Sequence, residues 1–180
     1  MIYFITSNSN KFREAEEIFS GHGISIEQKS APYKEIQADT LEEVVMEALE
    51  SIDEENIFIE DAGLFVDALG GFPGVYSRYV EDVLGNEAIL KLLSDVKERG
   101  AVFKSVVGYK GNDIMIFEGT VEGEIAEEKR GNAGFGYDPI FIPKGFNNTF
   151  AEDINLKMRL SHRKQAMEKL AEYLANKDKK

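Results

Sequence analysis

The sequence predicts an α/β fold with a mixed sheet, parallel in the first half of the chain and antiparallel in the second, flanked by helices. Strand-like and helix-like stretches first alternate, and this order favours parallel pairing. Strand-like stretches later follow one another without a helix between them, and this order favours antiparallel pairing. With 180 residues, of which 43% are hydrophobic, the chain is expected to form one domain over residues 1–180.

The first half contains two amphipathic helices between short strands. Apolar residues recur at helical spacing from Phe12 to His22, and Gly23 ends that pattern. Thr40 and Glu43 form a capping box, which predicts that a second helix begins at residue 41. The strands expected in this half lie at 2–5, 24–26 and 57–59.

The second half begins with turn-forming residues at 70–77, which predict an irregular segment after a short element at 64–66. Asn86 is expected to cap a helix, and Ser161 is expected to cap the terminal helix. A hairpin turn is expected at 111–113 and a loop at 129–139. The strands expected in this half lie at 101–109, 114–117, 121–125 and 140–142.

The charge and the cysteine content exclude several classes of function. A net charge of -12 argues against nucleic acid or an anionic membrane as partner, because both attract clustered Lys and Arg. The absence of cysteine excludes disulfides, thiolate metal sites and cysteine nucleophiles. No signal sequence opens the chain, and no apolar stretch approaches the roughly 20 residues that span a bilayer. We therefore expect a cytoplasmic protein.

A polar hexapeptide joins the first strand to the first helix. The first N–H groups of a helix lack intrahelical partners and attract anions, and a lysine here adds positive charge. Capping by Ser or Asn explains one or two of these residues equally well, so both phosphate binding and capping stay open at this point. The hexapeptide consists of Thr6, Ser7, Asn8, Ser9, Asn10 and Lys11.

Three acids are candidates for metal binding or acid–base chemistry. Asp61 follows a buried strand, so it needs a hydrogen bond, an ion pair or a metal ion. The oxygens of its carboxylate suit Mg²⁺, which takes one or two carboxylates together with substrate phosphates and water. An Asx turn at 62–63 is the structural alternative for Asp61. Glu60 precedes Asp61, and Glu35 lies in a predicted loop, where a solvated acid is the alternative.

Two further stretches carry candidate ligand-binding side chains. Aromatic residues and an acid at 135–138 can stack on a base and accept hydrogen bonds, although aromatics before a strand are also typical of a core lid. Lys157 and the basic residues at 162–164 place positive charge near the start of the last helix. Surface cations that balance an acidic protein are the alternative for this group.

Five motifs occur in order along the chain: Ser-Asn-x-Asn-Lys at 7–11, Glu-Asp-x-Gly-Leu at 60–64, Gly-Gly-Phe-Pro-Gly-Val-Tyr-Ser at 70–77, Gly-Phe-Gly-Tyr-Asp-Pro-Ile-Phe at 134–141 and Ser-His-Arg at 161–163. Together they resemble the inosine triphosphate pyrophosphatase family, which hydrolyses non-standard purine nucleoside triphosphates. The resemblance implies an elongated mixed sheet with two lobes around a central nucleotide-binding cleft, and a homodimer.

The resemblance also implies roles for individual residues. The reaction would be Mg²⁺-dependent hydrolysis of small-molecule nucleoside triphosphates such as ITP, dITP and XTP to a monophosphate and pyrophosphate. Glu35 and Asp61 would serve the metal ion, Asp61 would act as general base, and Thr6 through Lys11 would hold the phosphates. The residues implied at the rest of the substrate are Ala62, Phe135, Gly136, Tyr137, Asp138, Lys157, His162 and Arg163.

The chain departs from many relatives at two places, and two other functions stay open. Ala62 lacks the hydroxyl that a serine often supplies beside the base, and Ile154-Asn155-Leu156 replaces a more acidic stretch. A pyrophosphatase for modified pyrimidines is the enzymatic alternative. A nucleotide sensor without catalysis is the alternative from another class, and it predicts tight binding without Mg²⁺-dependent release of pyrophosphate.

Overall fold

A computed structural model of the chain describes residues 1–31, 36 and 38–177. Its six strands form one sheet in the order β2-β1-β3-β4-β5-β6. The sheet is mixed and flanked by helices, as predicted, because β1 pairs in parallel with β2 and β3 while β5 pairs antiparallel with β6. The strands are β1 (Ile2–Ile5), β2 (Ile26–Lys29), β3 (Ile57–Val66), β4 (Gly100–Lys110), β5 (Ile114–Ile125) and β6 (Phe141–Pro143).

Five α-helices and three short 3₁₀ turns complete the described elements. The helices are α1 (Ser9–Gly21), α2 (Leu41–Ser51), α3 (Ser77–Leu92), α4 (Ile154–Leu160) and α5 (His162–Lys177). The 3₁₀ turns are Asp67–Leu69, Gly74–Tyr76 and Asp138–Ile140. None of the helices in the described ranges combines the length and the apolar character that crossing a membrane requires.

The chain divides into two compact units, each with its own hydrophobic core. The first consists of Met1–Asp61, Ser105–Gly119 and Arg163–Lys180, and the second of Ala62–Lys104 and Thr120–His162. The single domain over residues 1–180, the elongated shape and the central cleft stay predictions.

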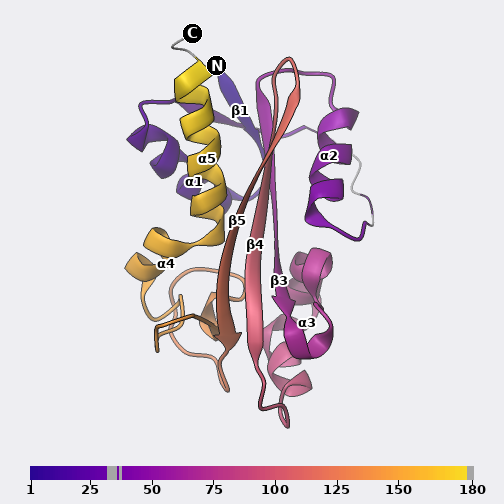
Figure 1. Cartoon of the computed structure of the whole chain (residues 1–180), viewed down its shortest axis with the longest axis vertical. Helices are drawn as coiled ribbons and strands as arrows, with labels where there is room; N and C mark the ends of the chain where they lie inside the picture. The colour runs from indigo at the N-terminus through magenta and orange to yellow at the C-terminus, as the bar shows by residue number, and fades with distance from the viewer. Residues whose placement is uncertain (32–35, 37, 178–180) are drawn as a thin grey trace. The chain divides into compact units, whose positions relative to one another are not determined.

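The first unit is a helix–sheet–helix layer in which α1 and α5 cover one face of the strands and α2 covers the other (Figure 1). Successive side chains of a strand point to opposite faces. Val107 and Tyr109 of β4 accordingly pack with α1 and α5, while the intervening Gly108 meets Val45 and Leu49 of α2. Stacked aromatic rings fill the core on the α1 side, where Phe4 and Phe58 lie 4.4 Å apart between centroids.

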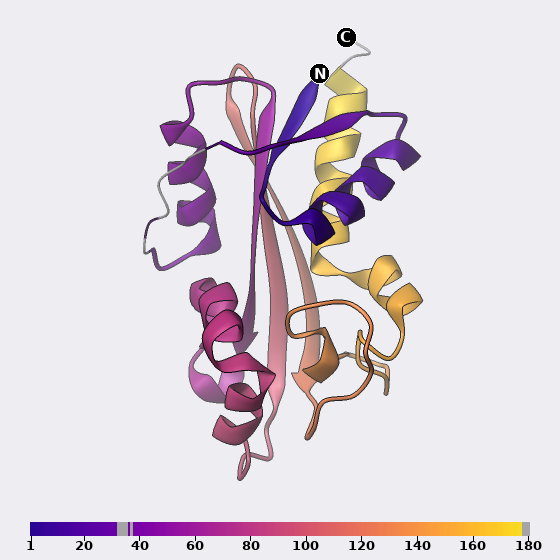
Figure 2. The same cartoon turned by 180° about the vertical axis from the view of Figure 1, so that it is seen from behind.

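The second unit packs α3 beside its strands, and α4 and the segment around β6 lie on the other side of them (Figure 2). Aliphatic side chains and a group of packed aromatic rings form this core. Phe103 of β4 contacts Phe141 and Phe150, with ring centroids 4.6 and 6.4 Å apart. The side chain of Asp153 caps α4 by accepting a hydrogen bond from the Leu156 N–H at 2.9 Å. No pattern at 154–160 predicted this helix, because seven residues are too few to establish a helical period.

Several predicted strand boundaries are wrong. The strand expected at 24–26 is β2, which runs from 26 to 29, where it pairs residue by residue with β1. The strand expected to end at 59 continues to 66, so Glu60 and Asp61 lie inside β3 and not at its carboxyl end. The strands expected at 114–117 and 121–125 are one strand, β5. In the latter two places polar or small residues suggested a break, but pairing with neighbouring strands carries the backbone through them.

The α3 helix also differs from its prediction. It begins at Ser77 and breaks at Gly85, whose φ of 69° and ψ of -177° are not helical. Asn86 therefore starts the second half of α3, as a capping residue would, but its side chain does not accept from the helix. Its Nδ2 donates to the carbonyl oxygen of Gly136 at 3.0 Å, and its buried Oδ1 has no hydrogen-bond partner among the described residues.

Candidate functional site

Side chains of the hexapeptide after β1 accept hydrogen bonds from backbone N–H groups of the same hexapeptide. The Asn8 side chain caps α1 and accepts hydrogen bonds from the N–H groups of Asn10 and Lys11 at 2.9 and 3.2 Å. Thr6 Oγ1 in turn accepts from the Asn8 N–H at 3.1 Å. The capping interpretation is thus confirmed for Asn8, while Ser7 and Ser9 are exposed. A phosphate bound here would rely chiefly on side-chain donors, because three backbone donors already have partners.

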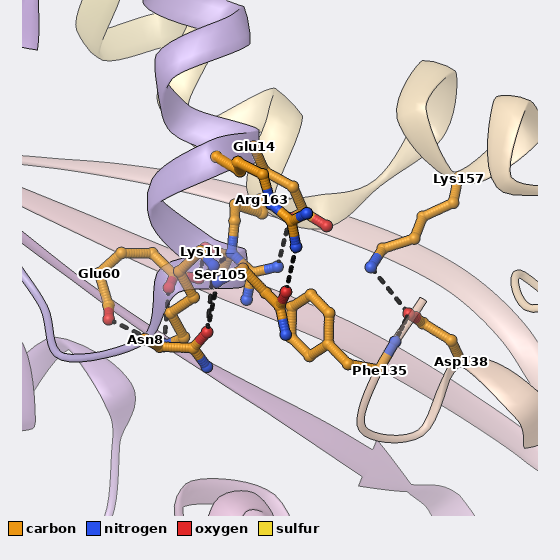
Figure 3. A network of polar contacts seen from close by, with 11 residues as sticks. Asn8, Lys11, Glu14, Glu60, Ser105, Phe135, Asp138, Lys157 and Arg163 are labelled. Atoms are coloured by element: carbon orange, nitrogen blue, oxygen red, sulfur yellow. Dashed lines mark hydrogen bonds and ion pairs between the residues drawn. The ribbon is translucent and has the colours of Figure 1, made fainter. Parts of the chain in front are cut away.

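Lys11 extends from this turn to Glu60 in β3 (Figure 3). Its Nζ lies 2.8 Å from Glu60 Oε2 and 3.2 Å from the Glu60 backbone oxygen. That oxygen belongs to the peptide that joins Glu60 to Asp61. The lysine predicted to hold phosphate therefore lies beside the backbone that carries the predicted general base.

Glu60 is the centre of a buried ion cluster in the first unit. Its Oε1 accepts hydrogen bonds from the Ser105 hydroxyl at 2.7 Å and from Arg163 Nε at 3.2 Å. Arg163 Nη1 also pairs with Glu14 of α1 at 2.7 Å. The side chain of Glu60 is fully buried and that of Arg163 is 4% exposed.

The electrostatics of this cluster keep both of its central groups charged. Burial by itself would raise the pKa of Glu60, but the positive charges of Arg163 and Lys11 and the hydrogen bonds from Lys11 and Ser105 hold that pKa well below its usual range. Burial by itself would likewise lower the pKa of Arg163, but Glu60 and Glu14 raise it.

Asp61 is partly exposed and follows Glu60 in β3. Because neighbouring side chains in a strand point to opposite faces, Asp61 points away from the face on which Glu60 meets α1 and α5. The other predicted metal ligand, Glu35, lies outside the described residues.

The chemistry of the described acids fits a Mg²⁺ ion that shares its ligands with substrate. Within the part of the chain that the structure describes, no three His, Asp or Glu side chains gather into a group that could hold a metal ion. Mg²⁺ often takes only one or two protein carboxylates and completes its shell with phosphate and water oxygens. The carboxylate of Asp61 is partly exposed, which suits this mode, and that of Glu60 is fully buried.

The second unit contains a rigid loop at 134–138 built on a buried ion pair. Lys157 Nζ lies 2.7 Å from Asp138 Oδ2, and the same oxygen accepts a hydrogen bond from the Phe135 N–H at 2.8 Å. The lysine ammonium also lies 4.1 Å from the centroid of the Phe135 ring (Figure 3). Gly134 has a φ of 73°, and a β-carbon there would overlap Asp138. The loop therefore presents Phe135 in a fixed orientation, with its ring against a cation.

Two further hydrogen bonds tie this loop to α3. The Tyr137 hydroxyl donates to the Ser77 carbonyl oxygen at 2.8 Å, and Asn86 binds the carbonyl of Gly136 as described above. Burial, with the negative charges of Glu81 and Asp82, raises the pKa of Tyr137 far above its usual range. The phenol is therefore a permanent donor at neutral pH.

His162 is a buried ring of the second core. It stacks on Phe103 with centroids 4.5 Å apart and an interplanar angle of 9°. Its 4% exposure places most of its surface against protein. Ala62, by contrast, is partly exposed next to Asp61.

The predicted site residues thus fall into two groups, one in each unit. Thr6 through Lys11, Asp61 and Arg163 belong to the first unit, and the other predicted substrate-binding residues, from Ala62 to His162, belong to the second. Sequence reasoning missed the partners Glu14, Ser105 and Asn86, and it weighed Glu60 only as a neighbour of Asp61. No local pattern marks them, because each acts through a residue far away in the sequence.

Comparison with known proteins agrees with this architecture. The model of the Ham1 family matches residues 2–173. The chain is 49% identical to a dITP/XTP pyrophosphatase of Thermococcus kodakarensis, covering 95% of both chains, and 46% identical to one of Methanopyrus kandleri, covering 97% of this chain and 96% of that protein. The solved Ham1 protein of Staphylococcus aureus is 29% identical and superposes with a TM-score of 0.83 over 98% of both chains. The chain therefore belongs to the Ham1 family.

Proposed function

We propose that this protein hydrolyses non-standard purine nucleoside triphosphates, ITP, dITP and XTP, to the nucleoside monophosphate and pyrophosphate. The observation that carries the proposal is the position of Lys11, whose ammonium lies 3.2 Å from the peptide oxygen between Glu60 and Asp61. The cation proposed for the phosphates therefore lies beside the peptide that leads into the residue proposed as general base. The names of relatives 46% and 49% identical to this chain support the same reaction.

In the proposed mechanism the first unit handles the phosphates. Lys11 donates to phosphate oxygens, and the side chains of Thr6 through Asn10 add neutral donors around it. Asp61 takes the proton of the water that adds across the anhydride bond between the α and β phosphates, and pyrophosphate leaves. Because hydrolysis of a triphosphate depends mainly on charge neutralisation and placement of the water, one carboxylate suffices as base.

The proposed cofactor is Mg²⁺, held by Asp61 and Glu35 together with phosphate oxygens. When bound, it would supply positive charge to the phosphates and lower the pKa of bound water. The partial exposure of the Asp61 carboxylate supports its part of this assignment.

The second unit would hold the purine. The Phe135 ring, which is partly exposed and has the Lys157 ammonium 4.1 Å from its centroid, would stack on the base. Asp138 and Lys157 fix the loop, with Gly136, Tyr137, His162 and Ala62 completing the proposed surroundings. Hypoxanthine and xanthine present an acceptor at the 6-position, where adenine presents a donor. A donor such as Arg163 or a backbone N–H therefore would leave adenine unpaired. We further propose a cytoplasmic homodimer.

The decisive experiment measures pyrophosphate release from ITP, dITP, XTP, ATP and GTP with and without Mg²⁺. We expect Mg²⁺-dependent release from the first three and little from ATP. Preference for modified pyrimidine triphosphates would favour the pyrimidine alternative, and tight nucleotide binding without any release would favour a sensor.

Asp61→Asn tests the assignment of the base in the same assay. We expect turnover to be abolished while the circular dichroism spectrum and the thermal midpoint stay close to wild type, because Asp61 is partly exposed and the amide has nearly the same shape as the carboxylate. Near-normal release of pyrophosphate by this variant would remove Asp61 from the role of base.

A further inference from the structure

Glu60 stands out among the buried groups because the proposed mechanism does not use it. Its side chain is fully buried, yet it contacts Lys11 from α1, Ser105 from β4 and Arg163 from α5. All four residues belong to the first unit. A single carboxylate thus links two helices and a neighbouring strand to β3 (Figure 3).

Stability alone does not account for this arrangement. Burying an ion cluster costs desolvation energy, and well-packed apolar side chains of similar volume often stabilise a protein as well or better. A hydrophobic side chain at position 60 could fill the same space between the strand and the helices. The cluster instead holds the Lys11 ammonium in one place.

The contacts of Lys11 show what the carboxylate achieves. A lysine has a flexible four-carbon chain that loses much rotamer entropy when its ammonium is fixed. Here its ammonium is fixed at two points of one residue, 2.8 Å from the carboxylate and 3.2 Å from the backbone oxygen of Glu60. The formal charges of Glu14, Glu60, Lys11 and Arg163 cancel, so the cluster holds the lysine in place without a bound anion.

We propose that Glu60 is a positioning residue that holds the Lys11 ammonium in the orientation in which it meets the phosphates. The inference rests on the proposed function. Glu60 does not touch substrate and acts through Lys11. The Ser105 hydroxyl, which donates to Oε1 at 2.7 Å, fixes the carboxylate in turn.

A double-mutant cycle on XTP hydrolysis with Mg²⁺ tests the proposal. Glu60→Gln keeps the shape of the side chain but loses its charge. We expect kcat to fall by about 10-fold to 100-fold, since misplacing a catalytic contact by about 1 Å has effects of that order. KM should stay level or fall, because the variant removes a negative charge near the site of a polyanion.

The second arm of the cycle is Lys11→Met, for which we expect activity about 10²-fold to 10³-fold below wild type, still measurable. If Glu60 acts through Lys11, Glu60→Gln has little further effect in the Lys11→Met background. A purely structural role would reduce activity by the same factor in both backgrounds. An equal factor in both backgrounds, or a KM that rises in Glu60→Gln, overturns the proposal.

Two variants keep the test interpretable. Glu54→Gln is the matched control, because Glu54 pairs with Lys29 in the same unit but is 41% exposed, and its kinetics should equal wild type. If Glu60→Gln does not fold, Ser105→Ala removes only one donor to the carboxylate. We then expect Ser105→Ala to lower kcat severalfold in the wild-type background. In the Lys11→Met background the same substitution should have little further effect. An unchanged kcat in Ser105→Ala would then overturn the proposal. Absence of pyrophosphate release by wild type would instead refute the proposed function itself.

Discussion

The buried pair between Lys157 and Asp138 gives the sharpest prediction of stability. Lys157→Met replaces the lysine by an unbranched apolar side chain of similar length and removes the ammonium 2.7 Å from Asp138. The two side chains are 2% and 4% exposed, so the carboxylate would lose its cation in a place that water hardly reaches. Breaking a buried ion pair by removing one partner costs about 3–5 kcal/mol.

Thermal unfolding followed by circular dichroism measures this cost. For a chain of this length about 1 kcal/mol corresponds to about 2–4 °C, so we expect the midpoint of Lys157→Met to fall by about 6–20 °C. Adding Asp138→Asn should restore a large part of the loss, because a neutral amide no longer leaves an uncompensated charge in the core.

The chain offers a matched control for this experiment. Lys144 and Glu122 also approach to 2.7 Å and belong to the same unit, but their side chains are 76% and 66% exposed. Lys144→Met should leave the midpoint unchanged, because water and salt screen an exposed pair. Equal midpoints for Lys157→Met and Lys144→Met, or no recovery in the double variant, would refute the argument from burial.

Two further predictions concern packing and ionisation. In Gly108→Ala the new β-carbon would overlap the side chains of Val45 and Leu49. We therefore expect the free energy of unfolding to fall by about 1–3 kcal/mol, measured as a lower urea midpoint. An unchanged midpoint would mean that α2 moves aside freely. For Tyr137→Phe, the tyrosinate absorbance of the folded variant should equal that of wild type near pH 10, because burial raises the pKa of Tyr137 and keeps its phenol neutral there. The stabilisation linked to that raised pKa is complete below about pH 10 and is lost as pH rises above it. A smaller tyrosinate absorbance near pH 10 in Tyr137→Phe than in wild type would contradict this assignment.

Local patterns were sufficient for most helices and strands. The capping box at Thr40 and Glu43 predicted the start of α2, and its hydrogen bonds are present at 3.2 Å in both directions. Likewise the change from alternating to consecutive strands predicted a sheet with both parallel and antiparallel pairs. These features depend on neighbours within one or two turns of the chain, so the sequence carries them directly.

The boundaries that failed depend on distant partners. A charged pair at 60–61 looks like the end of a strand, because an unpaired acid cannot be buried cheaply. The partners of the Glu60 carboxylate, Ser105 and Arg163, lie 45 and 103 residues away along the chain. They supply the hydrogen bonds that allow this acid to be buried inside β3. No window of local sequence contains that information.

The sequence by itself determined the mixed α/β class and the family resemblance, because these follow from residue types and their order, and it predicted the side chains of the site. Only the tertiary structure decided which of those side chains are held and by what. It paired Lys11 with Glu60 and Lys157 with Asp138. The physical reason is that a buried charge is stable only beside its counter-charge, and folding brings counter-charges together from segments that are distant along the chain.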